Sequence, residues 1–239
     1  MTDTSAGGAR SGTLSEPQVQ AMFDRIASVY DLMNSVMTAG MHHRWRSRAA
    51  DLAALGPGGR ALDVATGTGD LAAELERRVG ADGEVVGSDF SEGMLTLARK
   101  KVAGVRFEHG NALALPYDDD SFDAATVGFG ARNFSDLAAG LREMARVVRP
   151  GGRVVVLEIT TPQRPPLSWF FGLWFDRLVP LIGRAAGDPE AYTYLPSSVR
   201  RFPDARGLAA AMAAVGLVDV RWIVTAGGII AIHVGTVER

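Results

Sequence analysis

One short stretch constrains the fold of this 239-residue chain more than any other, and it reads Leu62-Asp63-Val64-Ala65-Thr66-Gly67-Thr68-Gly69-Asp70. It leads from an apolar run, typical of a strand, into a segment with helical spacing. Gly67 and Gly69 permit a tight turn and let a ligand approach the backbone closely. Asp89 follows at the end of the next predicted strand, where an acid can accept both ribose hydroxyls of a nucleoside. The stretch therefore predicts a cofactor site at a turn between strand and helix.

Two cofactor classes fit this loop. The pattern Gly67-x-Gly69-x-x-Ala72 matches the dinucleotide fingerprint, with Asp89 as its ribose acid. Asp63 favours S-adenosyl-L-methionine, because a carboxylate inside the first strand suits an ammonium and a sulfonium but would repel a pyrophosphate. An NAD-dependent oxidoreductase and a scaffold that binds cofactor only to stay folded remain as alternatives.

Strand and helix patterns alternate along the chain from residue 61 onward. We predict strands at 61–65, 84–88, 105–108, 122–127, 153–159, 217–225 and 229–237, and helices at 70–79, 91–102, 135–148 and 204–215. Such repeated units imply an α/β fold with a mostly parallel sheet and helices on both faces. The last two strands have only the turn Gly227-Gly228 between them, so the sheet should end with an antiparallel strand.

The remaining segments complete a single predicted domain over 16–239. Residues 1–15 are small and polar and are expected to form a flexible tail. Residues 16–55 have helical spacing and should form a cap, with its second helix at 42–55. Residues 160–202 break the alternation and are expected to be a substrate or lid insertion.

This insertion holds the densest aromatic cluster of the chain. The cluster runs over 169–175 and is followed by Leu178, Val179, Leu181 and Ile182. These side chains are expected to line a tunnel for a lipid chain or to dip into a membrane surface, with Arg177 and Arg184 meeting anionic headgroups. An ordinary core helix over the sheet edge is the alternative.

Composition excludes several function classes. A formal net charge of −2 argues against non-specific nucleic-acid binding, and the absence of cysteine excludes thiolate nucleophiles and Cys-based metal sites. No leader-like segment and no run of about 18 apolar residues occurs, so we expect a cytoplasmic protein. The aromatic insertion adds the expectation of peripheral contact at the inner face of the membrane.

Two polar clusters invite a metal hypothesis. His42 and His43 adjoin Arg44 and Arg46, and a solvated basic patch is the better interpretation because no carboxylates cluster with them. The run 118–120 of three aspartates is better interpreted as an acidic surface loop. We therefore predict no metal site.

The chain as a whole resembles the ubiquinone/menaquinone biosynthesis C-methyltransferases. The resemblance covers the chain nearly end to end, and its most specific stretches are Tyr30-Asp31-Leu32-Met33-Asn34 and Phe129-Gly130-Ala131-Arg132-Asn133-Phe134. Further motifs are Met22-Phe23-Asp24-Arg25-Ile26-Ala27, Asp120-Ser121-Phe122-Asp123, Pro150-Gly151-Gly152, Tyr194-Leu195-Pro196 and Gly227-Gly228-Ile229-Ile230-Ala231-Ile232-His233.

The resemblance implies a seven-stranded, Rossmann-like S-adenosyl-L-methionine-dependent methyltransferase fold. It implies C-methylation of demethylmenaquinol to menaquinol, the last step of menaquinone biosynthesis, on a prenylated naphthoquinol. A benzoquinol of ubiquinone biosynthesis, or another small phenol or lipid, is the alternative substrate.

The resemblance also implies which residues bind the cofactor. Thr66 and the loop backbone, with Gly67 and Gly69, would hold the methionine part and Asp89 the ribose. Asn111 and Ala112 would hold the adenine, and Asn111 can accept a hydrogen bond from the adenine amino group although it stands where relatives have Asp. Gly128 stands where some relatives have Ser, so a side-chain contact is missing there.

Methylation of a ring carbon is helped by any group that stabilises the ionised hydroxyl of the ring. Arg132 is the first candidate, because a permanent cation stabilises a phenolate rather than taking its proton. Asn133 and Tyr30 are candidates for positioning the oxygen, and His109 for a base or proton relay. The structural alternatives are that Arg132 pairs with Asp31 or Asp136, that Tyr30 packs the cap, and that His109 is an ordinary loop residue.

Overall fold

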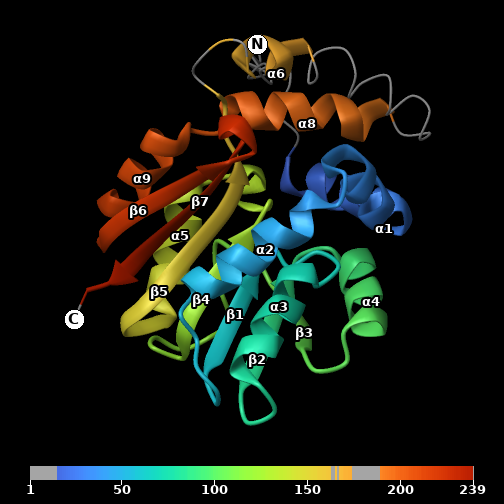
Figure 1. Cartoon of the computed structure of the whole chain (residues 1–239). Helices are drawn as coiled ribbons and strands as arrows, with labels where there is room; N and C mark the ends of the chain where they lie inside the picture. Colours follow the sequence, from blue (N-terminus) through green and yellow to red (C-terminus); the bar gives the residue numbers. More distant parts are fainter. Residues whose placement is uncertain (1–14, 163–164, 166, 174–188, 239) are drawn as a thin grey trace, which may run out of the picture.

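A seven-stranded sheet with the order β3-β2-β1-β4-β5-β7-β6 organises the chain (Figure 1). The structure is a computed structural model that describes residues 15–162, 165, 167–173 and 189–238. The strands are β1 Arg60–Val64, β2 Glu84–Asp89, β3 Arg106–His109, β4 Phe122–Gly128, β5 Val148–Ile159, β6 Leu217–Thr225 and β7 Ile230–Val237. The helices are α1 Glu16–Thr38, α2 Met41–Leu52, α3 Asp70–Val79, α4 Glu92–Lys101, α5 Leu137–Arg146, α6 Leu167–Leu173, α8 Pro189–Arg201 and α9 Ala205–Ala214, with short 3₁₀ turns at Ala131–Asn133 and Ala226–Gly228.

The predicted mostly parallel sheet with a reversed last strand is confirmed. β7 pairs antiparallel with both β5 and β6, and the other pairings are parallel. The expectation that the reversed strand ends the sheet is wrong, because β7 lies between β5 and β6 and leaves β6 at the edge. A hairpin fixes only that two strands are neighbours, and pairing of β7 with β5 buries its apolar residues on both faces.

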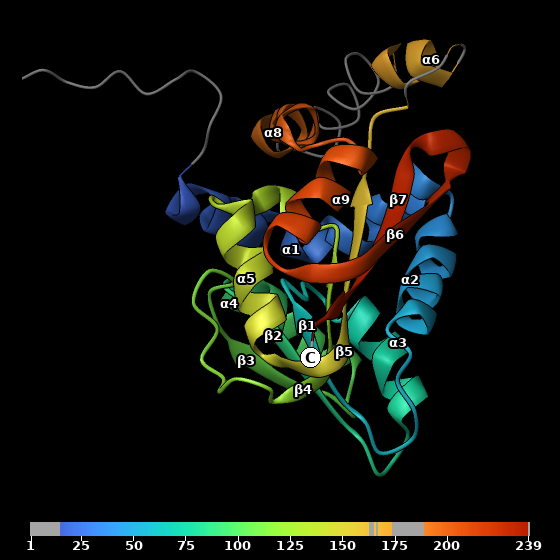
Figure 2. The ribbon, with the colours of Figure 1, turned by 90° about the vertical axis from the view of Figure 1, so that its left-hand side faces the viewer.

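Successive side chains of the central strands enter two separate cores, as the period of two requires. Leu62 and Val64 of β1 pack in the core that α5 and α9 cover, whereas Ala61 packs in the core that α2, α3 and α4 cover. Figure 2 shows α2 and α3 on the opposite side of the sheet from α5 and α9. Burial on both faces explains why these strands read as continuous apolar runs.

Side-chain caps place three of the helix starts. Ser91 accepts a hydrogen bond from the backbone N–H of Met94, and Asp136 and Asp204 cap α5 and α9 in the same way. The helix predicted to reach residue 148 ends at Arg146, because Val148 already pairs with Phe122 and a register shift follows before Arg153.

The predicted cap and insertion supply α1, α2, α6 and α8. Phe171 of α6 is buried against Met22 and Val199, whereas Trp169 is 74% exposed. Residues 1–14 of the predicted tail lie outside the described residues, as do Trp174, Phe175, Arg177, Leu178, Val179, Leu181, Ile182 and Arg184 of the predicted lipid-binding cluster. Across the described segments, no helix combines the length and the apolar character needed to cross a bilayer.

Candidate functional site

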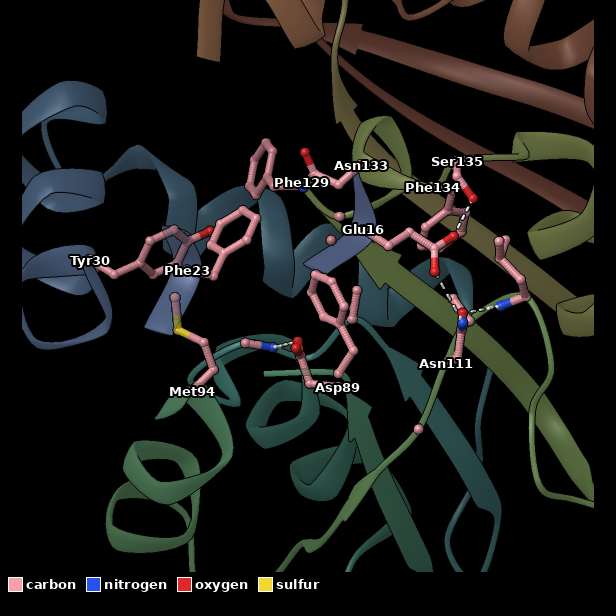
Figure 3. A pocket seen from close by; sticks show the side chains of 18 residues that line it. Glu16, Phe23, Tyr30, Asp89, Met94, Asn111, Phe129, Asn133, Phe134 and Ser135 are labelled. Carbon is pink, nitrogen blue, oxygen red and sulfur yellow. Dashed lines mark hydrogen bonds between the residues drawn. The ribbon is translucent and has the colours of Figure 1, made fainter. Parts of the chain in front are cut away.

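A cavity opens at the carboxyl ends of β1, β2, β3 and β4 (Figure 3). The space between its walls, including the part open to solvent, is about 690 Å³. The sheet order places it where the chain turns from β1 toward β2 on one side and toward β4 on the other, the usual switch point for ligands in such sheets. Its lining includes Tyr30, Gly67, Asp89, Asn111, Ala112, Gly128 and Asn133 from the predicted site.

The glycine-rich loop presents its backbone to this cavity. Gly67 has φ +57°, and a Cβ atom added there would meet nothing within 4 Å, so its backbone faces open space. Gly69 is the N-cap of α3 at φ +82°, and a Cβ atom would lie 2.8 Å from the ring of Phe107. Gly67 therefore keeps the cavity open, and Gly69 lets the loop pack closely on β3.

Two non-glycine residues in left-handed conformation also line the cavity. Ala65 has φ +51° and Phe129 has φ +62°, and each follows the end of a central strand. Such strain costs on the order of 1–3 kcal/mol and concentrates at functional sites.

Asp89 faces the cavity with its carboxylate already oriented. Its two oxygens accept hydrogen bonds from the backbone N–H groups of Gly67 at 2.8 Å and Ser91 at 2.9 Å. Burial raises the pKa of Asp89 to about 6, although these backbone donors oppose the shift. A carboxylate offers about four acceptor positions, so acceptor capacity remains for ribose hydroxyls.

Asp63 lies behind the loop and is not among the residues that line the cavity. It is 1% exposed, and its oxygens accept hydrogen bonds from the hydroxyls of Thr66 at 2.7 Å and Thr126 at 2.6 Å. Burial raises the pKa of Asp63 to about 6. Asp63 and Thr66 therefore hold the loop in its conformation. The Asp63 charge can act on a ligand only across the loop, because Asp63 does not line the cavity.

At the other end of the cavity, Asn111 and Ala112 follow β3. The Asn111 Oδ1 accepts a hydrogen bond from the backbone N–H of Leu113 at 2.9 Å, which holds the amide in place (Figure 3). Its Nδ2 lies 3.5 Å from Glu16 at the start of α1, and Glu16 also accepts a hydrogen bond from the hydroxyl of Ser135. The first turn of the cap thus closes the cavity over Asn111.

A second, apolar cavity adjoins the first. Its space, including the part open to solvent, is about 840 Å³, and it shares Phe23, Tyr30 and Phe129 with the first cavity. Most of its wall is aliphatic, aromatic or thioether, including Met22, Ile26, Met33, Met37, Ile159 and Leu195. Methionine side chains adapt to irregular apolar ligands, so this cavity suits a flexible hydrocarbon.

Arg132 brings a cation to this apolar cavity. Its Nη1 lies 2.8 Å from Oε1 of Glu158, and its backbone N–H donates to Oε2 of the same residue at 3.2 Å. Burial alone would lower the pKa of Arg132, but the charge of Glu158, its hydrogen bond and the neighbouring Tyr30 and Tyr194 together hold the pKa above its ordinary value. The Arg132 Nε is a buried donor with no hydrogen-bond partner in the described part of the chain, so the fold leaves this polar group unsatisfied.

The alternative prediction that Arg132 pairs with Asp31 or Asp136 is wrong. Asp31 binds Lys101 at 2.6 Å and the hydroxyl of Thr68, and Asp136 caps α5. His109 is exposed at the end of β3 and lies outside the linings of both cavities.

Asn133 and Tyr30 lie where the two cavities meet. The hydroxyl of Tyr194 on α8 donates to Oδ1 of Asn133 at 3.2 Å, which links the insertion to the site. Tyr30 lines both cavities from α1. The structure therefore brings Arg132, Asn133 and Tyr30 to one boundary, although they come from segments about 100 residues apart.

The prediction that His42, His43, Arg44 and Arg46 form a solvated basic patch is wrong for two of these four residues. His42 is 2% and Arg46 is 6% exposed, and both line the second cavity, whereas His43 and Arg44 are exposed. The i and i+4 spacing places His42 and Arg46 on one face of α2. The sequence alone does not show that this face is buried. In the chain as described, no group of three or more His, Asp or Glu side chains is arranged to hold a metal.

Several residues of the site were not predicted. Phe23, Phe90, Met94, Phe129 and Phe134 line the first cavity, and Glu158 holds Arg132. Glu158 carried a signal, because an acid inside a valine-rich strand must find a buried partner. The aromatic residues carried none that separates a cavity wall from an ordinary core.

Comparison with known proteins agrees with this geometry. Residues 12–237 match the model of the ubiE/COQ5 methyltransferase family. A demethylmenaquinone methyltransferase of Roseiflexus castenholzii is 50% identical over 91% of this chain and 92% of its own, and one of Thermus thermophilus is 47% identical over 90% and 99%. A ubiquinone/menaquinone biosynthesis C-methyltransferase UbiE of Geobacter sulfurreducens is 42% identical over 91% and 88%.

Solved structures share the fold at low identity. An S-adenosylmethionine-dependent methyltransferase of Thermotoga maritima, described as a possible histamine N-methyltransferase, matches with a TM-score of 0.66 over 92% of this chain and 99% of its own, at 20% identity. The [4+2]-cyclase SpnF matches with a TM-score of 0.65 over 95% and 98%, also at 20% identity. These likenesses establish the fold alone.

Proposed function

This chain belongs to the ubiE/COQ5 methyltransferase family, and from that premise we propose that it methylates a ring carbon of demethylmenaquinol to give menaquinol. It is a methyltransferase, and its cofactor is S-adenosyl-L-methionine. The observation that carries the proposal is the junction of a polar cavity and an apolar cavity at Phe23, Tyr30 and Phe129.

The first cavity fits the cofactor by the chemistry of its donors and acceptors. Asp89 would accept the ribose hydroxyls, Asn111 and Ala112 would hold the adenine, and the open backbone at Gly67 would hold the methionine part. When bound, the cofactor supplies a methyl group on a positively charged sulfur, which departs as a neutral thioether when the ring carbon attacks. Gly128, at the end of β4, contributes only backbone to this cavity.

The second cavity fits a reduced, prenylated naphthoquinol. Its apolar wall would bury the prenyl chain, and about 0.8 kcal/mol is available for each buried methylene. Its boundary with the first cavity would place the ring near the methyl donor, and such alignment removes roughly 7–11 kcal/mol from a barrier.

Arg132 would stabilise the negative charge that develops on the ring oxygen. Its guanidinium is held by Glu158 at the wall of the apolar cavity, so it is preorganised to stabilise that charge. Asn133, oriented by Tyr194, and Tyr30 would position the same oxygen. The hydroxyl proton and, after the carbon–carbon bond forms, the proton of the ring carbon pass to solvent water. The ring then regains aromaticity and its oxygen is reprotonated, so one proton is released overall.

We also propose peripheral contact with a membrane, which is where a prenylated substrate resides. Trp169 and Leu173 are exposed on α6, the outermost helix in Figures 1 and 2. Exposed Trp and Leu side chains on one helix suit the interface of a bilayer. Sedimentation with anionic vesicles tests this, and unchanged sedimentation of Trp169→Ser/Leu173→Ser would contradict it.

The experiment that tests the function is transfer of a radiolabelled methyl group to chemically reduced demethylmenaquinol. A methylated naphthoquinol is expected, and the oxidised quinone should accept no label because its ring carbon is not nucleophilic. The name of the Geobacter relative supports a benzoquinol as the second candidate, so a demethylated benzoquinol belongs in the panel. Absence of transfer to both reduced substrates would reject the proposal.

A further inference from the structure

The second cavity contains two buried guanidinium groups from different elements. Arg132 comes from the turn after β4, and Arg46 comes from α2. Both contact Phe129: the guanidinium carbon of Arg46 lies 5.6 Å from the centre of its ring, and Nη1 of Arg132 donates to its carbonyl oxygen. The two cations therefore lie around one aromatic residue at the wall of the cavity.

The carboxylates that balance these cations lie behind the wall. Asp70 lies 3.2 Å from Arg46, and Glu158 lies 2.8 Å from Arg132. Among the described residues that line this cavity there is no Asp or Glu. The wall thus presents cationic donors in an otherwise apolar space, an arrangement that favours oxygen atoms carrying partial or full negative charge.

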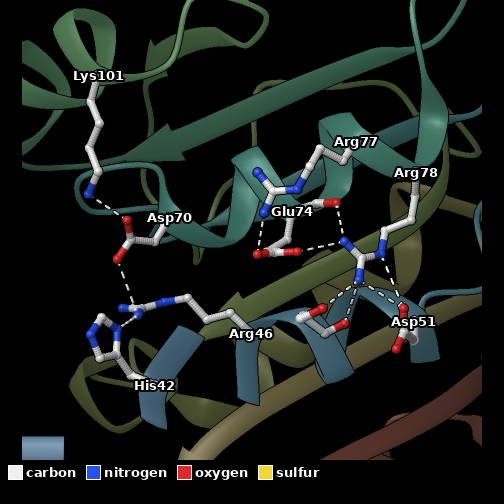
Figure 4. A network of polar contacts seen from close by, with 9 residues as sticks. His42, Arg46, Asp51, Asp70, Glu74, Arg77, Arg78 and Lys101 are labelled. Atoms are coloured by element: carbon white, nitrogen blue, oxygen red, sulfur yellow. Dashed lines mark hydrogen bonds and ion pairs between the residues drawn. The ribbon is translucent and has the colours of Figure 1, made fainter. Parts of the chain in front are cut away.

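His42 holds Arg46 in this position (Figure 4). The Arg46 Nη1 donates to Nδ1 of His42, so the proton of the neutral imidazole is on Nε2, which lies 3.2 Å from the hydroxyl of Ser35. Burial and, to a lesser extent, the charge of Arg46 lower the pKa of His42 to about 4, so the ring is neutral. The contacts with His42 and Asp70 both engage Nη1, and a guanidinium carries five N–H donors.

The substrate class of the proposed function has two oxygens at opposite ends of its ring. Arg132 and its neighbours account for one of them, the hydroxyl next to the carbon that is methylated. The other hydroxyl must also find a partner, because a buried polar group without one is costly. Arg46 is the remaining permanent cation among the described residues that line the cavity.

We propose that Arg46 is a second oxygen-binding residue, which holds the hydroxyl para to the one stabilised by Arg132, so that the cavity selects 1,4-dihydroxy rings over monohydroxy rings. His42 and Asp70 are the positioning residues that keep the guanidinium aimed into the cavity. This inference rests on the proposed function, because it concerns how the same site binds the second hydroxyl of the proposed substrate.

The test compares two substrates that differ by one hydroxyl. One is a short-chain prenylated naphthohydroquinone, and the other is the prenylated naphthol that keeps only the hydroxyl next to the acceptor carbon. The quantity of interest is the ratio of their kcat/KM values, measured for the wild type, Arg46→Met, Arg46→Lys and the control Arg48→Met. Arg48 is an exposed arginine on the same helix, and it pairs with Asp51 at 4.0 Å.

We expect Arg46→Met to lower kcat/KM for the diol by about 10²-fold and for the naphthol by less than about threefold. Arg48→Met should leave both values unchanged. A purely structural role would lower both substrates equally, and that result overturns the proposal. Calorimetric binding of the cofactor reports whether each variant is folded. If Arg46→Met does not fold, Arg46→Lys is the test: it should lower kcat/KM for the diol alone by about tenfold, because lysine keeps the charge but lacks the planar set of N–H donors of the guanidinium.

The wild type supplies a test that depends on no variant. Equilibrium dialysis should show that it binds the diol more tightly than the naphthol, and equal Kd values would overturn the proposal. Failure of the proposed function is a separate result, because the wild type would then methylate neither substrate. Methylation of both with no diol-specific effect at Arg46 rejects only this inference.

Discussion

Arg132 and Glu158 form a buried ion pair in which one carboxylate holds the guanidinium at 2.8 Å and the backbone N–H of the same arginine at 3.2 Å. Glu158 lies next to the last residue of β5, and Arg132 lies in the turn that follows β4. The Glu158 side chain at the end of β5 thereby orients both the backbone and the guanidinium of Arg132 in the turn after β4. The pair places a permanent cation beside an apolar cavity, which burial alone would oppose.

Glu158→Gln tests how much the fold depends on this pair. Removing one partner of a buried ion pair leaves the other charge uncompensated, so we expect the free energy of unfolding to fall by about 3 kcal/mol. Urea denaturation measures the change. Glu92→Gln is the matched control, because Glu92 pairs with Arg99 at the surface and should change stability by less than about 0.5 kcal/mol. A similar loss in both variants would contradict the assignment.

Arg132→Met separates the role of Arg132 in turnover from cofactor binding. Loss of a preorganised donor to a developing oxyanion costs about 10²–10³-fold in kcat. Calorimetry should find the Kd for the cofactor within about threefold of the wild type, because Arg132 lines only the second cavity of the two that meet at Phe129. A large change in this Kd with little change in kcat would show that Arg132 contacts the cofactor rather than the substrate.

The affinity for the cofactor should depend on pH through Asp89. Its pKa is raised by burial to about 6, so protonation begins near pH 6 rather than near pH 4 as in the unfolded chain. The protonated acid loses acceptor capacity for the ribose hydroxyls, so Kd should be constant above pH 7 and should rise toward tenfold per pH unit below about pH 6.

Asp63 has a similar pKa of about 6, so a variant must separate the two acids. Asp63→Asn should keep the rise of Kd below pH 6, whereas Asp89→Asn should bind weakly with a Kd that changes little across this range. Calorimetric titrations at several pH values give both profiles. A wild-type Kd that stays constant down to pH 5 would exclude Asp89 as the ribose acceptor.

Two glycines of the loop predict opposite outcomes on substitution by alanine. Gly67→Ala adds a methyl group toward open space, so stability should fall by only about 1–2 kcal/mol, the cost of the left-handed backbone. Its cofactor Kd should nonetheless rise at least tenfold, because the methyl group occupies the cavity. Thermal unfolding and calorimetry measure the two effects.

Gly69→Ala should act on folding instead. The added Cβ atom would lie 2.8 Å from the buried ring of Phe107, and the strain of such overpacking adds roughly 1–3 kcal/mol to the backbone cost. If Gly67→Ala binds the cofactor as tightly as the wild type, the loop backbone does not contact the ligand.

The alternation of strands and helices was predictable because it rests on local patterns. The strand over 217–225 and the helix over 70–79 agree with the structure at both ends, since apolar runs and turn residues mark them. The position of β7 inside the sheet was not predictable, because the order of strands depends on contacts between distant segments. The same limit hid the pairing of Arg132 with Glu158.

The cofactor loop was recognisable because its function depends on residues close together in the sequence. The second cavity was not, because its wall combines α1, α2, the turn after β4, β5 and α8. His42 illustrates the difference: beside His43 and Arg44 it reads as exposed, and only packing of α2 against the sheet buries it. Helical spacing assigns a face to each residue but does not say which face is inside.

Asp31 fastens the cap to the cofactor loop and provides the last prediction. It accepts a hydrogen bond from the hydroxyl of Thr68 at 2.6 Å and pairs with Lys101 at 2.6 Å, and Lys101 also binds Asp70 at 2.5 Å. Helix α1 lines both cavities, so its attachment should govern access to them. Partly exposed contacts of this kind contribute about 1 kcal/mol, which corresponds to roughly fivefold in an opening equilibrium.

We therefore expect Asp31→Ala to speed amide hydrogen exchange in α1 about fivefold and to raise the cofactor Kd by a similar factor. Asp51→Ala is the matched control, because Asp51 pairs with Arg78 on α3 and makes no contact with the cofactor loop. That control should leave exchange in α1 unchanged. Unaltered exchange in Asp31→Ala would show that packing of α1 on α4, rather than this polar contact, holds the cap closed over the two cavities.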